Sequence, residues 1–285
     1  MRNLSFVFFL LISKITCYSQ VLSLDSSYGD RERFVKEVKQ LDQFFKRFNN
    51  REDIFTGEVK SLEAYSKEKK DLVKFQTERK KSLLTLLNFS DSVLIKKKET
   101  VDFINYAGDD SNHVELGYND EDWYAKVECS FKYRGQKQGV LLTLKREGTP
   151  DLGNKWVIKG VDLPFISLNS IRTDTIKFIS PMNHEVGFMD LIKVFRDNLN
   201  IAQYTSTGFV PDKLNIFLYL IKTGELQYIS VNSIQYHFLQ IKSWLFTVDY
   251  FNRASNNSGW LISSIVSMDD AEKKNYKKNV LNTIP

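Results

Sequence analysis

Histidine is the side chain best suited to acid–base and metal chemistry near neutral pH, and this sequence contains three: His113, His184 and His237. None of them is paired with an Asp or a Glu at the spacing of metal ligands. We therefore expect a surface or helix-capping role for each. The sequence predicts no metal site, no cofactor and no catalytic residue.

A second group with possible chemistry is the acidic cluster Asp120, Glu121 and Asp122, which lies close to Tyr118. A carboxylate beside a tyrosine can support acid–base catalysis. Three consecutive acidic residues before a strand are more typical of a solvated turn, which is the interpretation we favour. The sequence also lacks a phosphate-binding glycine loop and a Ser or Cys nucleophile motif.

The elements that position these residues include a pattern that occurs twice, in residues 124–161 and 228–265. Each copy reads as an alternating strand, a tight turn, a second strand, a polar loop and a third strand that opens with Trp. Seven positions coincide at a constant offset of 104 residues, which predicts two related β-meanders. These positions pair Tyr124 with Tyr228, Val127 with Val231, Gln136 with Gln240, Leu141 with Leu245, Thr143 with Thr247, Trp156 with Trp260, and Ile158 with Ile262.

The four tryptophans fall into two classes under this alignment. Trp156 and Trp260 are equivalent, which favours a structural role in the core over a stacking platform for a ligand. Trp123 and Trp244 correspond to Gln227 and Val140, so neither has an aromatic counterpart. Trp123 and Trp244 are therefore the candidate ligand-binding residues, although a core position is the interpretation that we favour for both.

Apolar residues at helical spacing predict helices at residues 34–48, 58–87 and 180–199. A further helix is expected to begin at Pro211 and end at Gly224, with Leu214, Phe217, Leu218 and Ile221 facing inward. The lysines of residues 58–87 suggest a surface for an anionic partner. The acidic residues among them favour a solvated helix face instead.

Outside the repeated pattern, alternation predicts strands at residues 101–106 and 113–118. Residues 164–178 mix polar and apolar side chains and are expected to connect the two halves along the surface. From Asp269 the chain becomes highly charged, and we expect a frayed tail over residues 269–285.

Residues 1–19 have the features of a secretory signal peptide: Arg2 near the start, an unbroken apolar run over residues 6–12, and small residues before Gln20. The apolar run is shorter than the ~20 residues of a membrane-spanning helix, so no transmembrane segment is expected in the mature chain. An uncleaved anchor, or a lipoprotein lipidated at Cys17, is the alternative. The sequence thus predicts an exported protein, either periplasmic or secreted.

The net charge and the cysteine content indicate which partners and cross-links to expect. Cleavage after Ser19 would remove Arg2 and Lys14 and lower the formal net charge from +5 to +3, which is too small to indicate nucleic-acid binding. It would also remove Cys17 and leave Cys129 as a lone cysteine, so no disulfide is expected. The partner is expected to be a small molecule or a protein.

The order of helices followed by an antiparallel meander with a Trp-led strand resembles the nuclear-transport-factor-two-like superfamily, which includes ketosteroid isomerases and polyketide-cyclase-like proteins. The segments that carry the resemblance are 34–48 with 123–161, and 188–199 with 228–265. The resemblance implies an α+β fold of two cone-like domains, each with N-terminal helices packed on a curved antiparallel sheet. These domains would occupy residues 30–163 and, in a shorter copy, 180–268.

That superfamily contains enzymes, ligand binders and interaction modules, so the fold alone does not decide the function. An isomerase or dehydratase would need a buried carboxylate or His facing a Tyr inside a cone. An acid-free, apolar cone would fit a binding protein. Because the residues show no catalytic arrangement, we favour an exported, non-catalytic ligand-binding or protein-interaction protein, with the isomerase or dehydratase as the alternative.

Overall fold

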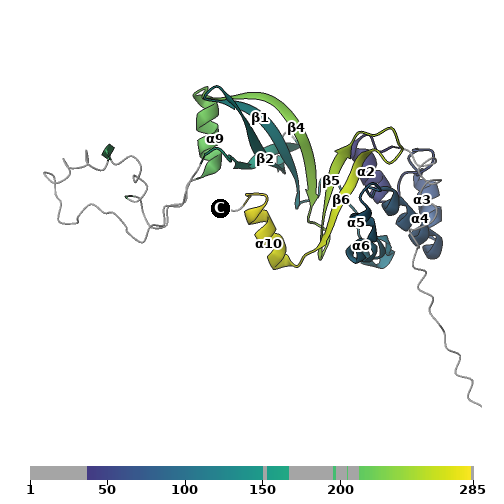
Figure 1. The fold of residues 1–285 in the computed structure, drawn as a ribbon. Coiled ribbons are helices and arrows are strands. Elements are labelled where there is room, and N and C mark those ends of the chain that lie inside the picture. The colour runs from purple at the N-terminus through teal and green to yellow at the C-terminus, as the bar shows by residue number, and fades with distance from the viewer. Residues whose placement is uncertain (1–36, 150–152, 167–194, 197–203, 205–211, 284–285) are drawn as a thin grey trace, which may run out of the picture.

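The computed structural model describes residues 37–149, 153–166, 195–196, 204 and 212–283, and shows one six-stranded antiparallel sheet with helices around it (Figure 1). The strand order is β3-β2-β1-β4-β5-β6. The mixed composition, the antiparallel sheet and the N-terminal helices are as the sequence predicted. The strands are β1 (Trp123–Tyr133), β2 (Gln136–Thr149), β3 (Gly153–Asp162), β4 (Leu226–Phe238), β5 (Trp244–Phe251) and β6 (Gly259–Ser267).

Three of the N-terminal helices, α3 (Leu62–Lys69), α4 (Leu72–Thr85) and α5 (Ser92–Lys96), begin at side chains that accept hydrogen bonds from the first turn. Ser61, Asp71 and Asp91 cap α3, α4 and α5 in this way, which satisfies backbone N–H groups that have no partner within the helix. The single helical region expected over 58–87 is therefore two helices, α3 and α4. The helices of this group are α2 (Leu41–Phe48), α3 (Leu62–Lys69), α4 (Leu72–Thr85), α5 (Ser92–Lys96), α6 (Lys98–Gly108) and the 3-10 turn η1 (Asp110–Asn112).

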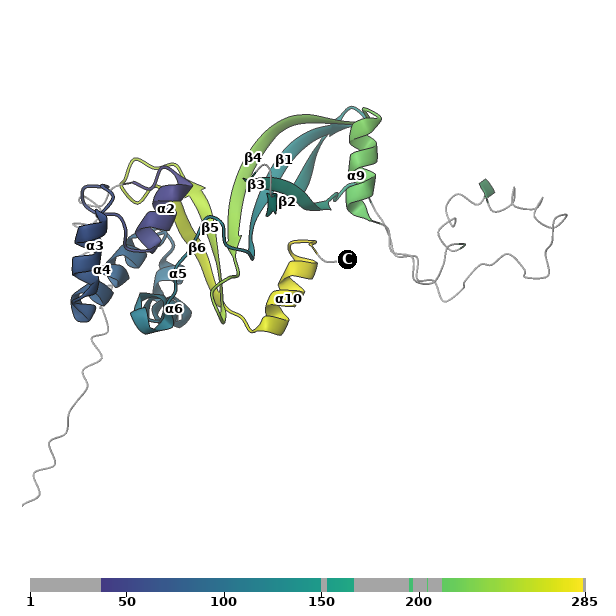
Figure 2. The ribbon, with the colours of Figure 1, turned by 180° about the vertical axis from the view of Figure 1, so that it is seen from behind.

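The N-terminal helices pack mainly on the second meander, and the helix before β4 packs mainly on the first. Helices α2, α5 and α6 contact β6, in a core where Phe44, Phe48 and Phe103 stack around Phe246. Helix α9 (Lys213–Lys222) packs Phe217 and Leu220 against the other end of the sheet, on β1, β2 and β3. Each segment therefore covers the meander that does not directly follow it, which differs from the expected arrangement. Figures 1 and 2 show the two groups of helices at opposite ends of the sheet.

The two meanders are joined edge to edge through β1 and β4, which pair antiparallel from Trp123–Phe238 to Tyr133–Leu226. Residues 30–163 and 180–268 therefore contribute strands to one sheet. The helix before β4 faces inward with Phe217 and Leu220, whereas Leu218 and Ile221 are exposed, against expectation. Gly224, at a positive φ of 77°, ends this helix as predicted.

The repeated pattern recurs in the pairing register of the outer strands. Leu144 pairs with Ile158 and Arg146 with Trp156, while their counterparts 104 residues later pair in the same way, Val248 with Ile262 and Tyr250 with Trp260. Both ladders also carry a bulge at the same place, after Thr143 and after Thr247.

The first strand of each meander does not keep this offset. Thr143 lies opposite Lys126 in β1, whereas Thr247 lies opposite His237 in β4, 111 residues after Lys126. The reason is the connection to the second strand. Arg134 and Gly135, both at positive φ, form a two-residue turn after β1, whereas β4 is followed by the longer loop 239–243. Tyr124 and Tyr228 are therefore not equivalent in the sheet.

The expected strands at 101–106 and 113–118 are wrong. Residues 98–108 form α6, whose buried positions Thr100, Phe103, Ile104 and Ala107 have the three-and-four spacing of a helix face. Residues 113–118 belong to no strand: His113 and Tyr118 lie in turns, and residues 114–117 have no regular secondary structure. The side-chain amide of Asn49 both accepts from the Leu116 N–H and donates to the Leu116 carbonyl, which replaces a strand partner.

The expected frayed tail is also wrong for the described part of residues 269–285. Asp269 and Glu272 form a reciprocal capping box at the start of helix α10 (Asp270–Asn279). The buried ammonium of Lys273 donates to the carbonyls of Leu239 and Ile241, and Leu281 is fully buried. A high charge content therefore did not prevent docking, because Lys273 binds carbonyls of the loop 239–243 and Lys277 pairs with Asp122.

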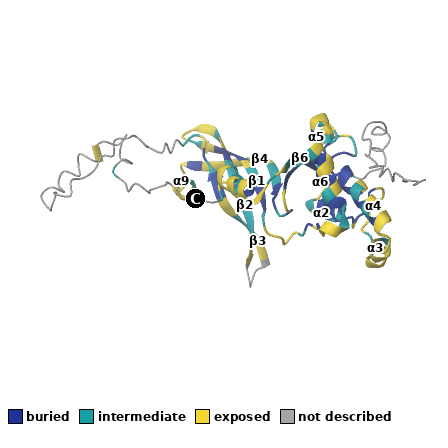
Figure 3. Cartoon of the chain, turned by 90° about the horizontal axis from the view of Figure 1, so that it is seen from below, coloured by how far each residue is buried: buried dark blue, intermediate teal, exposed yellow. Residues whose placement is uncertain are grey.

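Some expectations lie outside the described residues: the leader 1–19, residues 34–36 of the first helix, most of the connector 164–178, and the helix at 180–199 apart from residues 195–196. The first helix begins at Leu41, later than expected, because residues 37–40 are not helical and Val38 forms a bridge with Gly259. Within the described residues, every helix is too short or too polar to cross a membrane. Figure 3 shows that α3 and the outer side of α9 are largely exposed, whereas buried positions lie on the strands and on α2, α4 and α6.

Candidate functional site

Four aromatic residues from four strands meet on one face of the sheet, and we call them the aromatic row: Trp156 of β3, Trp123 of β1, Tyr236 of β4 and Trp260 of β6. The ring centroids of Trp123 and Trp156 are 5.0 Å apart, and those of Tyr236 and Trp260 are 4.9 Å apart. Tyr236 also lies 6.4 Å from Trp156. The row therefore connects the two outer strands of the sheet.

The curve of the sheet, which Figure 1 shows, favours this contact. Trp156 and Tyr236 stand on strands separated by two others, a distance of about 14 Å in a flat sheet with ~4.8 Å between strands. Their ring centroids are only 6.4 Å apart. Ala125, which pairs with Tyr236, is the smallest residue in this part of the face and leaves room for the Tyr236 ring. The curvature gathers rings that a flat sheet would keep apart.

The strand positions around the row carry no acidic side chain among the described residues. One rung crosses all six strands with Ile158, Leu144, Ala125, Tyr236, Val248 and Ile262. Beside it, Trp156 pairs with Arg146 and Trp123 pairs with Phe238. Burial raises the pKa of Tyr236, and the nearby Tyr118 adds to this effect. Tyr236 is therefore a neutral phenol at pH 7, and the face offers stacking and apolar contact rather than acid–base chemistry.

The charge at the edge of the row is positive. The Arg146 guanidinium lies 4.1 Å from the centre of the Tyr118 ring and 5.9 Å from that of Trp123. Its Nη2 atom donates to Asn119 Oδ1, which also accepts from Asn154 Nδ2. Asn119, Asn154 and Arg146 thus form a polar rim next to partly exposed rings.

Burial separates the four tryptophans into two pairs. Trp123 is only 1% exposed and stacks on Phe238 at 5.4 Å, and Trp244 is 8% exposed and packs against Phe103. These candidate ligand-binding residues lie in the main core, where their rings support neighbouring side chains. Trp156 and Trp260, which we expected in the core, are partly exposed at its border. The aromatic row thus contains one of the two candidates.

Tyr236 is the member of the row that sequence reasoning missed. Its position was visible in the alternation of Ile234, Tyr236 and Phe238 along β4. The strand prediction was correct there, but only the curvature of the sheet shows that Tyr236 stands between Trp156 and Trp260. No local pattern of the sequence encodes that proximity.

The acidic cluster is held by structural contacts. Asp120 accepts from the Gly117 N–H, and Asp122 forms an ion pair of 2.7 Å with Lys277. The Tyr124 hydroxyl donates to Asp122 at 3.4 Å, and burial raises the pKa of Tyr124. The Asp122 side chain is 44% exposed and already paired, so this contact is not a buried carboxylate facing a buried tyrosine.

Two of the three histidines lie in the described residues. His113 adopts a left-handed conformation at the end of η1. His237 is buried, and its Nδ1 shares a hydrogen bond of 2.8 Å with the Tyr276 hydroxyl. Within the described chain, no group of three or more His, Cys, Asp or Glu side chains could hold a metal ion.

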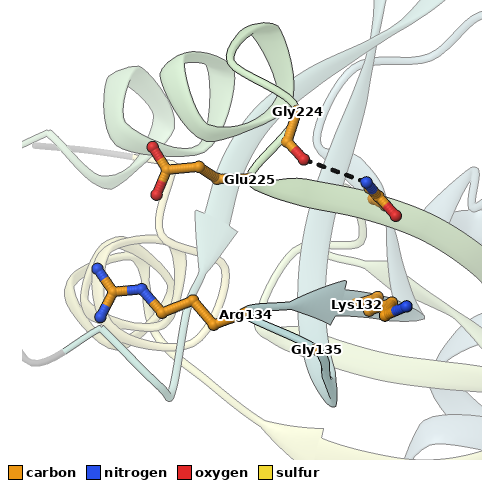
Figure 4. A pocket seen from close by; sticks show the side chains of 6 residues that line it. Lys132, Arg134, Gly135, Gly224 and Glu225 are labelled. Carbon is orange, nitrogen blue, oxygen red and sulfur yellow. Dashed lines mark hydrogen bonds between the residues drawn. The ribbon is translucent and has the colours of Figure 1, made fainter.

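A shallow hollow of about 350 Å³ lies at the far end of the sheet, between the β1–β2 turn and the α9–β4 turn (Figure 4). Lys132, Arg134 and Gly135 line one side, and Gly224, Glu225 and Gln227 line the other. It lies at the ends of β1 and β4 that are away from Trp123 and Tyr236, and it contains no buried titratable side chain. Its small size and open form make it a weaker candidate than the row.

Comparison of the chain with family models, with curated proteins and with solved structures found no match.

Proposed function

We propose that the protein is an exported, non-catalytic binding protein that takes up an apolar or ring-containing ligand, or a protein segment with such side chains, on the aromatic row. The proposal rests on one observation. Trp156, Tyr236 and Trp260 are partly exposed on a curved, acid-free face, with the polar rim at one edge. Aromatic rings of this kind contribute a large contact area and fix orientation by stacking.

The resemblance to the nuclear-transport-factor-two-like superfamily remains part of this proposal. Two separate cores support it, each made of helices on a bent part of the sheet. In that view one unit consists of α9 with β1–β3, and the other of α2–α6 with β5 and β6. Export is likewise proposed, from residues 1–19 of the sequence.

The alternative of an isomerase or dehydratase finds less support. Such an enzyme needs a carboxylate or histidine near a tyrosine inside the pocket. Tyr236 has apolar neighbours in its rung, and the Tyr124–Asp122 contact is tied to Lys277 instead of facing the row. We therefore retain binding as the proposed activity.

The test uses an apolar fluorescent probe, anilinonaphthalene sulfonate, with the mature chain. The proposal expects saturable probe binding that weakens at least tenfold in Trp156→Ala and in Trp260→Ala. The control is Tyr219→Ala, which removes an exposed aromatic ring from α9 and should leave probe binding unchanged. Far-UV circular dichroism verifies that each variant is folded. Equal binding by all four proteins would contradict the proposal.

A further inference from the structure

One half of β4 presents an unpaired backbone edge in the described structure. On one side β4 pairs with β1 from Leu226 to Phe238. On its other side it pairs with β5 only over Gln235–Phe238. Figure 1 shows β4 arching away from β5 toward α9. The segment Leu226–Ile234, which we call the open edge, therefore has no strand partner on that side within the described part of the chain.

The open edge lacks two usual protections of exposed strands, charged side chains and proline. Its residues, LQYISVNSI, include no charge and no proline. Tyr228, Ile229 and Val231 are 60%, 49% and 47% exposed. Two register shifts in the β1–β4 ladder bend this half of the strand, but bends alone leave its N–H and C=O groups accessible. Natural proteins guard such edges with lysine, proline or cover, because an exposed apolar edge pairs with other strands.

The neighbouring helix also exposes apolar side chains. Helix α9 contacts β4, and its outer side exposes Leu218 and Tyr219. Along β4 the charged neighbour of the open edge is Glu225 at its start, and in the paired strand β1 Glu128 and Lys132 lie opposite Ser233 and Gln227. An occupant must therefore be an extended, uncharged strand whose own edge is free.

We propose that the occupant is a second copy of this chain, whose open edge pairs antiparallel with the first about a two-fold axis. A neutral strand meets no like charge when it pairs with itself, and a two-fold interface uses the same surface on both copies. Pairing centred on Ser230 sets Ile229 opposite Val231 of the second copy, and Tyr228 opposite Asn232. The shared ladder ends at Ile234, because Gln235 already pairs with Asp249 of β5.

The expected dimer is weak at low concentration. One pair of strands covers less than the ~1,200 Å² of a standard stable interface, even with Leu218 and Tyr219 at its border. A concentration-dependent equilibrium is therefore expected. This inference does not depend on the aromatic row, which lies at the opposite half of β4.

Sedimentation velocity of the mature chain over micromolar concentrations tests the proposal. We expect the parent to shift from monomer to dimer, with Ile229→Glu and Val231→Lys each weakening the dimer at least tenfold. The double variant places a carboxylate opposite an ammonium at both contacts and should recover dimerisation. Val93→Lys, an exposed change on α5, should behave as the parent. A parent that stays monomeric throughout, or single variants that dimerise like the parent, would overturn the proposal.

Discussion

Tyr276 of α10 and His237 of β4 are joined by a hydrogen bond of 2.8 Å between the phenol oxygen and Nδ1. His237 is 2% exposed, and its Nε2 atom has no partner within the described residues. Burial, together with the positive charge of Lys126, lowers the pKa of His237 from 6.5 to about 4. Burial also raises the pKa of Tyr276 to about 12. Both side chains are neutral at pH 7, and together they attach α10 to the sheet.

This pair predicts a loss of stability in mild acid. The unfolded chain takes up a proton on His237 near pH 6.5, whereas the folded chain does so only near pH 4. The free energy of unfolding should therefore fall as the pH decreases from 6.5 to 4, by up to ~3 kcal/mol from this residue. Chemical denaturation at several pH values measures the slope.

The matched variants are His237→Gln and His113→Asn. The first should flatten the slope between pH 6.5 and 4, whatever its effect on stability at pH 7. The second keeps a residue that tolerates the left-handed backbone of position 113 and should retain the slope of the parent. An unchanged slope in His237→Gln would show that other groups cause the acid sensitivity.

The tryptophans predict a clear order of stability effects. Trp123 and Trp244 are buried in the main core, so truncation to Ala should cost each ~3–5 kcal/mol of unfolding free energy. Trp156 and Trp260 are partly exposed, so their truncation to Ala removes less buried apolar area. The expected loss of unfolding free energy is on the order of 1–2 kcal/mol for each. Urea denaturation of the four variants gives the order. Equal losses at all four positions would place Trp156 and Trp260 in the core after all.

The sequence predicted the meanders well, because alternation and turn residues are local signals. The strand of residues 124–134, the turn at Gly135 and the Trp-led third strands all occur near their expected positions. Which helices cover which meander could not be derived in this way. That choice depends on contacts between Phe44 and Phe246, about two hundred residues apart in the chain, and no local pattern records such a contact.

The candidate site was also only partly predictable from the sequence. Equivalence of Trp156 and Trp260 in the repeat was correct for the pairing register, and we inferred from it that both rings are buried. Side chains at equivalent positions have the same pairing register, but they need not be buried to the same extent. Their exposure depends on the curvature of the sheet and on the helices nearby. Trp123 has no aromatic counterpart and is nevertheless the most deeply buried of the four.

Gly259 should tolerate no side chain. A Cβ atom at this position would overlap the Val38 carbonyl, and the residue has a positive φ of 91°. Val38 also pairs with the edge of β6 here, through bonds from Val38 N to Ser258 O and from Trp260 N to Val38 O. Gly259→Ala should therefore lower the free energy of unfolding by about 2 kcal/mol or more.

The control for that substitution is Gly139→Ala in β2. No atom lies within 4 Å of a Cβ built at Gly139, and its φ is not positive. This change should be neutral or stabilising by ~0.5–1 kcal/mol, because alanine restricts the unfolded chain more than glycine does. Thermal melting compares the two variants. A Gly259→Ala protein as stable as the Gly139→Ala protein would contradict the close approach of Val38.

Export predicts a defined N-terminus. If residues 1–19 are a cleaved signal peptide, the protein recovered outside the cytoplasm should begin at Gln20. Intact-mass spectrometry distinguishes this form from the full chain. A mass that includes Met1, or an acyl group on Cys17, would support an anchored protein instead.

Lys273 is expected to hold α10 against the loop between β4 and β5. Its ammonium donates to the Leu239 carbonyl at 2.8 Å and to the Ile241 carbonyl at 2.6 Å, and burial lowers the pKa of Lys273. Lys273→Met keeps most of the apolar stem but leaves both carbonyls without this donor. The expected loss of unfolding free energy is about 1–3 kcal/mol. Lys274→Met, at an exposed position of the same helix, should change stability by less than about 0.5 kcal/mol.

Hydrogen exchange locates the effect of this substitution. Lys273→Met should speed amide exchange in α10 and in residues 239–243 more than in α2, which lies on the other side of the sheet's second meander. Such a local change would show that the C-terminal helix is a docked element held by buried polar contacts. If exchange in α10 is already fast in the parent and does not change in Lys273→Met, the helix is not held by this lysine.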